Sequence, residues 1–380
     1  IEHHDSQMKI GIDGIPLSGH KTGVGHYTFE IAQGLATLFP AEEIQVLSHL
    51  PYDAEAINTN SEQLQNLHFV QPPVNSFTKH WWTIGLPKYI RKHGIDLFHG
   101  TNYDIPVWGG RPTVLTIHDL SSFLFAETHV QRRVRRARRR LPTMARLATR
   151  IIVPTESVRA EVREHLRVSD EKVRVIHYAP RRCFFPQSRV DAENVLKRLK
   201  IEEPFILYVG TIEPRKNVLT LVKAFEEIYR NTELRPQLVI AGPTGWLSDD
   251  LYAHVERSRV KDRLLITGYV GDEDLRALYN TCSVLSYPAL YEGAGLPPLE
   301  AMACGAPVIT SNVPSIVETV GDVARLVSPN DVHDIAQGIK HLIENAEERE
   351  HRSTAGMRHA QKFSWQRAAA ATLEVYRKVL

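Results

Sequence analysis

The feature that most constrains the fold is a repeated alternation of short, almost entirely apolar runs with longer stretches of helical character. The runs are rich in Val, Ile and Leu, as in FILYVG and QLVIAG of the second half. Runs of this kind suit strands that are buried on both faces, and strands that alternate with helices predict parallel, doubly wound sheets. The expected strands are 9–13, 44–48, 67–70, 96–99, 113–118, 150–154 and 173–177, followed by 205–210, 237–242, 263–268, 283–288, 307–311 and 324–328.

The order of these elements divides the chain into two similar halves. At roughly 150 residues per domain, 380 residues suit two domains. The stretch YAPRRCFFPQSRVDAENV between the halves has two prolines and no clear period, which is typical of a connection. We therefore expect an α/β protein with Rossmann-like domains over 8–183 and 200–363 and a linker over 184–199. The final segment, 364–380, reads as one helix with Ser364 as its N-cap, and we expect it to cross back to the first domain.

Composition limits the class of protein. A charged fraction of 24% and a hydrophobic fraction of 43% are ordinary for a soluble globular chain, and a net charge of +2 excludes no partner. Three cysteines, far apart and without a C-x-x-C pair, disfavour a disulfide framework or a zinc site and fit a reducing cytoplasm. No apolar run reaches the ~18 residues that span a membrane. The first residues, IEHHDSQ, look like a cloning remnant, so we expect the native fold to begin near Met8.

Ligands of open α/β sheets bind at the carboxyl ends of the strands, so the loops that follow strands are the candidate sites. Strand 9–13 leads into a glycine-rich loop, with Gly23 and Gly25 where the next helix begins. A helix N-terminus offers N–H groups and a positive dipole end, which suit a phosphate or a sugar oxygen. GVGHYT lacks the third glycine of the dinucleotide fingerprint, so NAD is disfavoured, and a plain flexible turn is the alternative. His118 ends strand 113–118 and would lie at the same strand-end edge, where a ligand cleft is expected, although a histidine there is often only a core residue.

A basic loop follows the first strand of the second half. The segment VGTIEPRKN, residues 209–217, brings Arg215 and Lys216 to the start of a helix. Cations at that position oppose the helix dipole. Their presence therefore favours an anionic ligand such as a diphosphate over a solvated basic turn.

An acidic loop occurs in YEGAGLPPLEAMACG, residues 291–305, where Glu292 and Glu300 bracket glycines and two prolines. Proline suits the first turn of a helix and Gly305 suits its end, so we expect Glu300 in the first helical turn and Glu292 on the loop before it. A carboxylate can accept two hydrogen bonds from a vicinal diol such as that of a ribose. The N–H groups of 293–296 could hold phosphate or sugar oxygens. Two surface glutamates without a ligand are the alternative.

These segments together resemble the retaining glycosyltransferases of family 4. The similarity includes E-x(7)-E and, in chain order, GVGHY, DLFHGTNYDIP, TIHDLSSF, VGTIEPRKN, AGPTGW, GYVGDEDLRALYNTC, SYPALYEGAGLPPLEAMACGAPVITSN and FSWQRAAAATLEVYRKVL. The resemblance covers nearly the whole chain. It implies the GT-B fold, in which two Rossmann-like domains face each other across a deep cleft and a C-terminal helix crosses back. It also implies sugar transfer from a nucleotide diphosphate sugar with retention at the anomeric carbon, without an obligatory metal or other cofactor.

The resemblance implies roles for individual residues. The implied catalytic group is His118, Glu292 and Lys216, with His118 beside the donor sugar. The implied nucleotide-sugar contacts are glycines, cations, loop backbone groups and one ribose-binding carboxylate: Gly23, Gly25, Arg215, Lys216, Gly293, Ala294, Gly295, Leu296 and Glu300. The first domain would bind the acceptor and the second the nucleotide sugar. Many members have arginine directly after the strand-end glycine, where this chain has Thr211, so diphosphate binding would rest more on Lys216 and Arg215.

One short motif resembles a metal site. DED at 272–274 has the spelling of the Asp-x-Asp that metal-dependent transferases of another fold use. It begins the helical stretch DEDLRALYN, where acidic residues suit the N-terminus. We therefore interpret it as helix capping and predict no metal site.

The run RRVRRARRR, residues 132–140, has seven arginines in nine positions. Seven like charges repel one another, which favours an anionic partner over a plain solvated face. Nucleic acid is disfavoured because no interleaved aromatic residues accompany the run. An anionic membrane surface and a polyprenyl-diphosphate-linked acceptor fit better, which predicts peripheral attachment at the inner face of the plasma membrane. WWTIGLPKYI at 81–90 could dip into that interface, although Trp81 and Trp82 could equally be core residues.

The sequence thus predicts a transferase that moves a sugar, with mannose from GDP-mannose as the best guess, to a lipid-linked or polysaccharide acceptor in cell-surface glycan synthesis. The segments VGTIEPRKN and ALYEGAGLPPLEAM most resemble those of mannosyltransferases in this family. Alternatives are a UDP-sugar-dependent transferase of the same family, a nucleotide-sugar epimerase of the same fold and a catalytically silent binding subunit. The acceptor, the linkage and the oligomeric state are not readable from the sequence.

Overall fold

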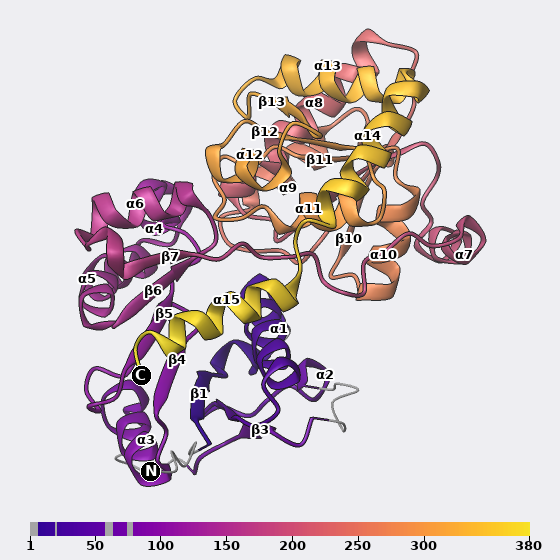
Figure 1. Ribbon diagram of the computed structural model, residues 1–380. Helices are drawn as coiled ribbons and strands as arrows, with labels where there is room; N and C mark the ends of the chain where they lie inside the picture. Colours follow the sequence, from indigo (N-terminus) through magenta and orange to yellow (C-terminus); the bar gives the residue numbers. More distant parts are fainter. Residues whose placement is uncertain (1–6, 20, 58–63, 74–78) are drawn as a thin grey trace. The chain divides into compact units, whose positions relative to one another are not determined.

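The computed structural model describes residues 7–19, 21–57, 64–73 and 79–380 (Figure 1). The residues before Met8 that look like a cloning remnant lie almost entirely outside this described part. The chain divides into two compact units. Unit 1 comprises 1–120, 136–178 and 364–380, and unit 2 comprises 121–135 and 179–363.

Unit 1 is built on a seven-stranded parallel sheet with the order β3-β2-β1-β4-β5-β6-β7. Most strand positions are fully buried, which explains the unbroken apolar runs. The strands are β1 (Lys9–Asp13), β2 (Glu43–Leu47), β3 (Leu67–Val70), β4 (Leu97–Gly100), β5 (Thr113–Thr116), β6 (Arg150–Val153) and β7 (Val173–Val175). The α-helices that lie wholly or mainly in this unit are α1 (Gly23–Leu38), α2 (Ala54–Ile57), α3 (Leu86–His93), α5 (Gln131–Leu147), α6 (Glu156–Leu166) and α15 (Trp365–Arg377).

The C-terminal helix α15 is an integral part of unit 1. Ser364 caps it by accepting a hydrogen bond from the N–H of Arg367. The helix packs along α1 (Figure 1), so closely that a Cβ atom on Gly34 would come within 2.8 Å of the Cβ of Ala369. At its far end the Tyr376 hydroxyl lies 2.7 Å from Nδ1 of His99 on β4, inside the core.

Unit 2 contains a six-stranded parallel sheet with the order β10-β9-β8-β11-β12-β13. Its strands are β8 (Phe205–Val209), β9 (Gln237–Ala241), β10 (Leu264–Gly268), β11 (Val284–Tyr287), β12 (Val308–Ser311) and β13 (Arg325–Val327). Its α-helices are α4 (Ser121–Leu124), α7 (Arg189–Leu199), α8 (Val218–Asn231), α9 (Asp249–Arg257), α10 (Asp272–Thr281), α11 (Leu296–Ala303), α12 (Pro314–Val320), α13 (Val332–Glu344) and α14 (Ala346–Ala360).

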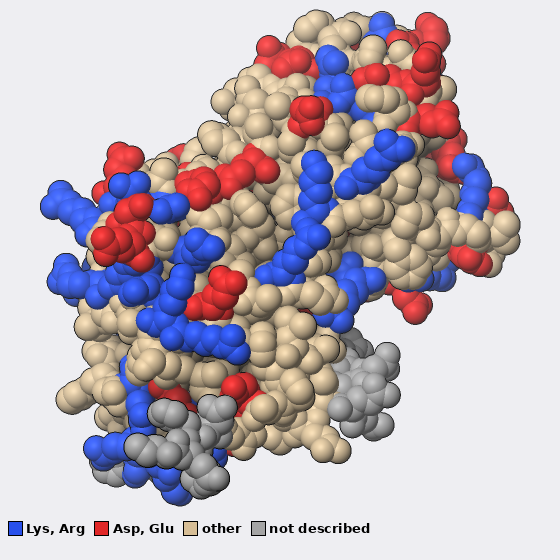
Figure 2. Space-filling view, viewed as in Figure 1, with Lys and Arg blue, Asp and Glu red and all other residues tan. Residues whose placement is uncertain are grey.

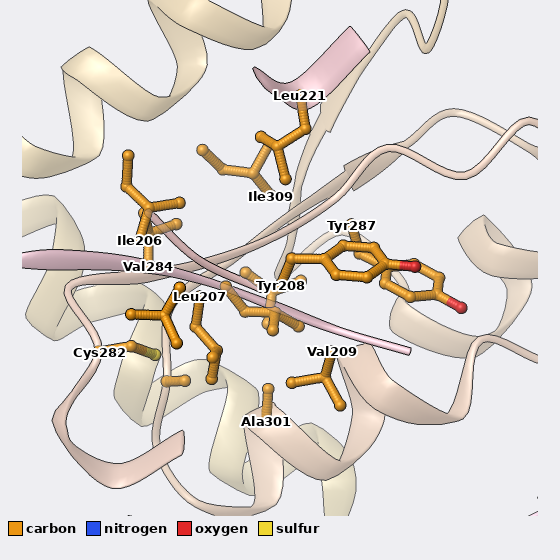
Figure 3. Close-up of a cluster of buried hydrophobic side chains, with 14 of the residues drawn as sticks. Ile206, Leu207, Tyr208, Val209, Leu221, Cys282, Val284, Tyr287, Ala301 and Ile309 are labelled. Atoms are coloured by element: carbon orange, nitrogen blue, oxygen red, sulfur yellow. The ribbon is translucent and has the colours of Figure 1, made fainter. Parts of the chain in front are cut away.

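The core of unit 2 joins the central strands to the helices that flank them. Figure 3 shows the side chains of β8 and β11 packed against Leu221 of α8 and Ala301 of α11. The rings of Tyr208 and Tyr287 stack with their centroids 5.9 Å apart, and both are fully buried. This packing fixes the ends of β8 and β11, where the polar loops begin.

Every expected strand is present in the structure, with ends that shift by at most two residues. Two parallel sheets with interspersed helices confirm the α/β class with Rossmann-like units. The boundaries differ from the expected ones at two places. The segment expected as a linker, 184–199, contains α7, which packs on α10 within unit 2. Residues 121–135 are grouped with unit 2 although the sequence places them inside the first domain.

Candidate active site

The charged loops of unit 2 lie at the point where the strand order of its sheet reverses. Strands β8 and β11 are neighbours, whereas β9 and β10 continue on one side and β12 and β13 on the other. In open parallel sheets the loops that leave the strands at such a switch point diverge and make room for a ligand. The loop after β8 holds Lys216, and the loop after β11 holds Glu292.

Lys216, Glu292 and Tyr287 form one hydrogen-bonded cluster. The Lys216 ammonium donates to Oε1 of Glu292 and to the Tyr287 hydroxyl, which is 2.7 Å away. The Tyr287 hydroxyl in turn donates to the same carboxylate oxygen over 2.8 Å. The side chains of Lys216 and Glu292 are 13% and 11% exposed, so water screens this ion pair only weakly.

Arg215 adds a second cation to this cluster. Its guanidinium lies 3.2 Å from Oε1 of Glu292, donates to the Tyr291 carbonyl over 2.9 Å and pairs with Glu213 over 2.6 Å. Burial acts to raise the pKa of Glu292, but the charges of Lys216 and Arg215 and the hydrogen bonds to the carboxylate hold it below its ordinary value. For Glu213 burial prevails and raises the pKa. Glu292 is therefore ionised at neutral pH.

One oxygen of the Glu292 carboxylate, Oε1, takes the hydrogen bonds and ion pairs described above. All contacts of this carboxylate with the described residues fall on Oε1. Its backbone carbonyl accepts a hydrogen bond from the Ser315 hydroxyl on α12, which fixes the loop. The second carboxylate oxygen can therefore accept hydrogen bonds from a ligand without breaking the cluster.

Asn217 ties the basic loop to two others. It caps α8 in the left-handed conformation, with φ of 62°, which asparagine tolerates better than most residues. Its side-chain amide donates to the carbonyls of Pro288 and Pro329 over 3.0 and 2.6 Å. Asn217 stands inside the VGTIEPRKN motif, yet its structural role depends on contacts 71 and 112 residues away that the sequence does not display.

The glycine loop 293–295 ends at the N-terminus of α11. Gly295 has φ of +63°, and no side chain among the described residues caps the helix. Pro297 and Pro298 have no N–H, so among the first three helical positions only Leu296 offers a backbone donor. The helix begins at Leu296, so Glu300 is its fifth residue and lies just past the first turn. The prediction that Glu300 is in the first turn was wrong because both prolines, not only the second, fit the first turn.

Glu300 takes part in a different cluster from Glu292. Arg181 donates to it through Nε at 2.7 Å and through Nη2 at 3.3 Å, and donates to Asp272 through Nη1 at 2.6 Å. The Glu300 side chain is only 5% exposed. Asp272 is the first residue of α10, so DED lies at a helix start where acidic residues suit the dipole, but the N-cap is Gly271 and none of the three carboxylates caps the helix. Arg181 was missed because it lies 119 residues from its partner outside every recognised motif.

The sites expected in the first domain lie in unit 1. His118 is buried, with Nδ1 2.7 Å from the Tyr178 hydroxyl and Nε2 2.7 Å from the Thr101 carbonyl. A carbonyl can only accept, so Nε2 carries the proton. Burial lowers the pKa of His118 to about 4, which keeps the imidazole neutral.

The two glycines of the first loop differ in their surroundings. Gly23, the first residue of α1, has open space where a Cβ atom would stand. A Cβ atom on Gly25 would come within 2.8 Å of the Pro16 carbonyl. Gly25 is therefore required for the close packing of α1 against the preceding turn, and Gly23 leaves the helix N-terminus open.

Similarity to known proteins agrees with this arrangement. Two family models match the chain, one for glycosyl transferases group 1 over residues 191–359 and one for Glycosyltransferase Family 4 over residues 21–179. A relative in Escherichia coli, the O-antigen chain mannosyltransferase B, is 31% identical over 380 residues, which cover 97% of this chain and 100% of the relative. The chain is a glycosyltransferase of family 4.

The glycosyltransferase is also similar to more distant proteins. The D-inositol 3-phosphate glycosyltransferase of Paenarthrobacter aurescens (strain TC1) is 26% identical over 94% of this chain and 84% of its own. The structure of Anabaena Alr3699/HepE in complex with UDP and glucose has a TM-score of 0.76 at 19% identity and covers 98% of this chain and 100% of its own. WaaG, a glycosyltransferase involved in lipopolysaccharide biosynthesis, has a TM-score of 0.73 at 17% identity, over 96% and 99%. These likenesses confirm the expected GT-B class.

Neither a membrane-spanning helix nor a metal-binding group of side chains occurs among the described residues of the glycosyltransferase. No helix among them has the length and apolar character needed to cross a membrane. No three histidine, cysteine, aspartate or glutamate side chains among them are grouped in a way that suits a metal ion.

Proposed function

We propose that this glycosyltransferase transfers mannose from GDP-mannose to a growing cell-surface glycan, with retention at the anomeric carbon. The choice of a mannose donor is supported by the E. coli relative, whose name specifies a mannosyltransferase of the O-antigen chain and which matches over its full length. The observation that carries the proposal is the cluster of Lys216, Arg215 and Glu292 at the switch point of unit 2. The matches to transferase families favour group transfer over the epimerase and silent-subunit alternatives.

The residues of the cluster suit the charge that develops during transfer. When the bond between the sugar and the diphosphate breaks, negative charge gathers on the departing GDP. Fixed cations and helix N-termini aimed at that charge stabilise the transition state. We propose that Lys216 and Arg215 supply the charge and that the backbone of Gly293, Ala294, Gly295 and Leu296 supplies N–H donors.

The two glutamates have separate proposed roles. The second carboxylate oxygen of Glu292 would accept hydrogen bonds from hydroxyls of the donor sugar, while Oε1 keeps Lys216 in place. Glu300 would hold the ribose hydroxyls, for which one of its oxygens must be shared with Arg181.

His118 would act beside the donor sugar as a neutral hydrogen-bonding group, because its pKa of about 4 leaves it uncharged near neutral pH. Gly23 and Gly25 would border the phosphate and acceptor side.

We further propose attachment to an anionic membrane through the arginine run of α5. The arginines at 132, 133, 135, 136, 138 and 139 are exposed, whereas Val134 and Leu141 are buried, so the helix shows a basic outer face. Figure 2 shows Lys and Arg side chains gathered over this part of unit 1. The indole of Trp81 belongs to a core cluster with Leu47 and Leu86, so the suggestion that it dips into the membrane is withdrawn.

Nucleotide binding tests the proposal first. Thermal unfolding is measured with GDP, UDP and NAD in parallel, with and without EDTA, since ligands that bind the native state raise the midpoint. A rise with GDP alone supports a GDP-sugar donor, and transfer of radiolabelled mannose from GDP-mannose to an extracted glycan acceptor then tests the reaction. A rise with UDP alone would keep the site but overturn the donor. A rise with NAD alone would overturn the assignment of Lys216, Glu292 and Glu300.

A further inference from the structure

Arg181 is a buried cation of unit 2 to which the proposed function gives no role of its own. Its side chain is 12% exposed and lies between two carboxylates, Glu300 and Asp272. Its Nε donates to Oε1 of Glu300 over 2.7 Å and its Nη2 donates to Oε2 over 3.3 Å, so the guanidinium meets that carboxylate edge to edge. Its Nη1 donates to Asp272 over 2.6 Å. The guanidinium thus bridges α10 and α11.

Aromatic rings support this guanidinium. Its central carbon lies 4.4 Å from the ring centroid of Phe184, a distance typical of a cation–π contact. The Phe184 side chain is itself buried and lies edge-on to Tyr279, with ring centroids 5.2 Å apart. The plane of the Arg181 guanidinium is therefore set by a ring below it and by carboxylates at its edges.

The segment that carries Arg181 is fastened to α10. Arg276 on that helix donates to the Gln187 side chain over 2.7 Å. Asn280, one turn later, accepts from the Gln187 N–H over 2.8 Å. These contacts do not involve Glu300, so we expect the segment to stay in place when the Arg181 side chain is shortened.

The cluster lies at the ligand-binding edge of the sheet. Helix α10 follows the carboxyl end of β10, and α11 follows that of β11, which is one of the two strands at the switch point. Asp272 and Glu300 both lie within the first two turns of their helices. A buried ion pair adds little to stability compared with apolar residues of similar volume, so its place at this edge favours a role in ligand binding.

The geometry allows Glu300 to accept two further hydrogen bonds from a ligand. An ionised carboxylate has about four lone-pair directions, and Arg181 takes one on each oxygen. The Tyr279 hydroxyl, at 3.5 Å from Oε2, is beyond the usual range of an O–H···O hydrogen bond. The described residues thus leave a direction on each oxygen, which matches two neighbouring hydroxyls that donate once each.

We propose that Arg181 is the positioning residue through which Glu300 distinguishes a ribose from a 2′-deoxyribose in the donor nucleotide. The proposal rests on the proposed function, because it takes Glu300 to hold the ribose. The planar fork of Arg181 fixes the plane of the carboxylate, so that its two oxygens accept from the 2′- and 3′-hydroxyls together. The last torsion of a glutamate side chain is broad, so a carboxylate without the fork rotates and accepts from the 3′-hydroxyl alone almost as well.

The test compares GDP with 2′-deoxy-GDP, which differ only in the hydroxyl concerned. Each nucleotide is titrated into the full chain by isothermal calorimetry. The parent should bind GDP about tenfold more tightly than 2′-deoxy-GDP, as expected for one hydrogen bond to a charged group. Arg181→Ala should weaken GDP binding and bring the ratio of the two affinities to within about twofold. A merely structural ion pair would weaken both nucleotides by the same factor, and an unchanged ratio would therefore overturn the proposal.

Arg198→Ala is the matched control. Arg198 pairs with Asp274, another carboxylate of the DED segment, over 2.5 Å, and its side chain is 59% exposed. The ratio of the GDP and 2′-deoxy-GDP affinities should equal that of the parent in this variant. A fall as large as that in Arg181→Ala would show a general effect of removing an arginine beside α10 and would refute the specific role of Arg181.

Arg181→Lys provides a second variant, which keeps the charge between the two carboxylates and so protects folding. An ammonium is a point charge without a planar fork, so the ratio of the two affinities should fall to about threefold. A ratio as high as that of the parent in Arg181→Lys would show that charge alone suffices and would contradict positioning by the fork.

The outcomes also separate this inference from the proposed function. If the parent binds UDP and not GDP, the proposed donor is wrong, and UDP with 2′-deoxy-UDP then tests Arg181 in the same way. If the parent binds GDP and 2′-deoxy-GDP equally well, the ribose role of Glu300 and the role of Arg181 fail together, whereas the GDP-sugar donor stands.

Discussion

Replacing Lys216 by methionine should separate its catalytic contribution from its structural one. Methionine keeps much of the apolar stem and removes the charge. In the variant, Glu292 retains Arg215 at 3.2 Å and the Tyr287 hydroxyl at 2.8 Å, so its carboxylate stays paired. The free energy of unfolding should therefore fall by only about 1–2 kcal/mol, well below the ~3–5 kcal/mol expected when a buried charge is left alone.

The effect of Lys216→Met on transfer should be much larger. A preorganised group that stabilises developing charge in a water-poor site contributes ~2.7–4 kcal/mol to the transition state, which is about 10²–10³ in kcat. Lys216 is 13% exposed and lies in the loop at the switch point, so it meets the condition of weak screening. The predicted signature is therefore a small loss of stability together with a loss of activity of two to three orders of magnitude.

The assay combines two measurements on the same preparation. Transfer of radiolabelled mannose is measured at saturating donor, and urea unfolding gives the stability of the protein. Lys223→Met, at an exposed position on α8, is the matched control and should change neither. The reasoning fails if Lys216→Met keeps activity within about threefold of the parent. In that case Lys216 serves only as the counter-ion of Glu292.

Other contacts give shorter predictions. Asn217→Ala should lower the free energy of unfolding by about 2–4 kcal/mol, because it deletes two buried hydrogen bonds and strains a left-handed backbone. Urea unfolding would show whether Asn217→Gly recovers part of this loss. The pKa of Glu292 is lowered in the folded state, so its contribution to stability is present above its ordinary pKa of 4.5 and is lost as the pH falls. The difference in unfolding free energy between the parent and Glu292→Gln should therefore shrink in acid. A difference that does not depend on pH would argue against the ion pair. Arg181→Ala should release Glu300 from its ion pair and change GDP affinity in a fluorescence titration. Neutralising the exposed arginines of α5 should abolish sedimentation with anionic vesicles, and full retention would remove the membrane proposal.

The sequence was a good guide wherever local pattern determines structure. Most strands were predictable because they are buried on both faces and so read as nearly unbroken apolar runs, whereas β3, β7, β10 and β13 are only partly buried. The loop at 209–217 and the one around Glu292 could be placed at strand ends for the same reason. The helix before Glu300 begins two residues ahead of Pro298, which moves Glu300 just past the first turn; either of two adjacent prolines fits the first positions of a helix.

Local sequence patterns did not predict the contacts between segments that are distant in the chain. Arg181 reaches Glu300 across 119 residues, and Asn217 joins two loops that each lie more than 70 residues further along the chain. The same limit applies to Asp13 and Asp104, which look like ordinary polar residues until the sheet order makes β1 and β4 neighbours. Pairing of this kind depends on topology, which a single sequence states only indirectly.

The two units use one topology for two kinds of chemistry. Each sheet reverses its strand order once, and each places polar loops at that point. In unit 2 the loops carry cations that two acids hold in position, which suits a ligand with high negative charge. In unit 1 the loops after β1 and β4 bring Asp13 and Asp104 to one end of the sheet, where Arg140 pairs with Asp104 and both signs of charge occur. The chemistry of each site thus follows from the residues at four strand ends, while the fold only decides where those residues meet.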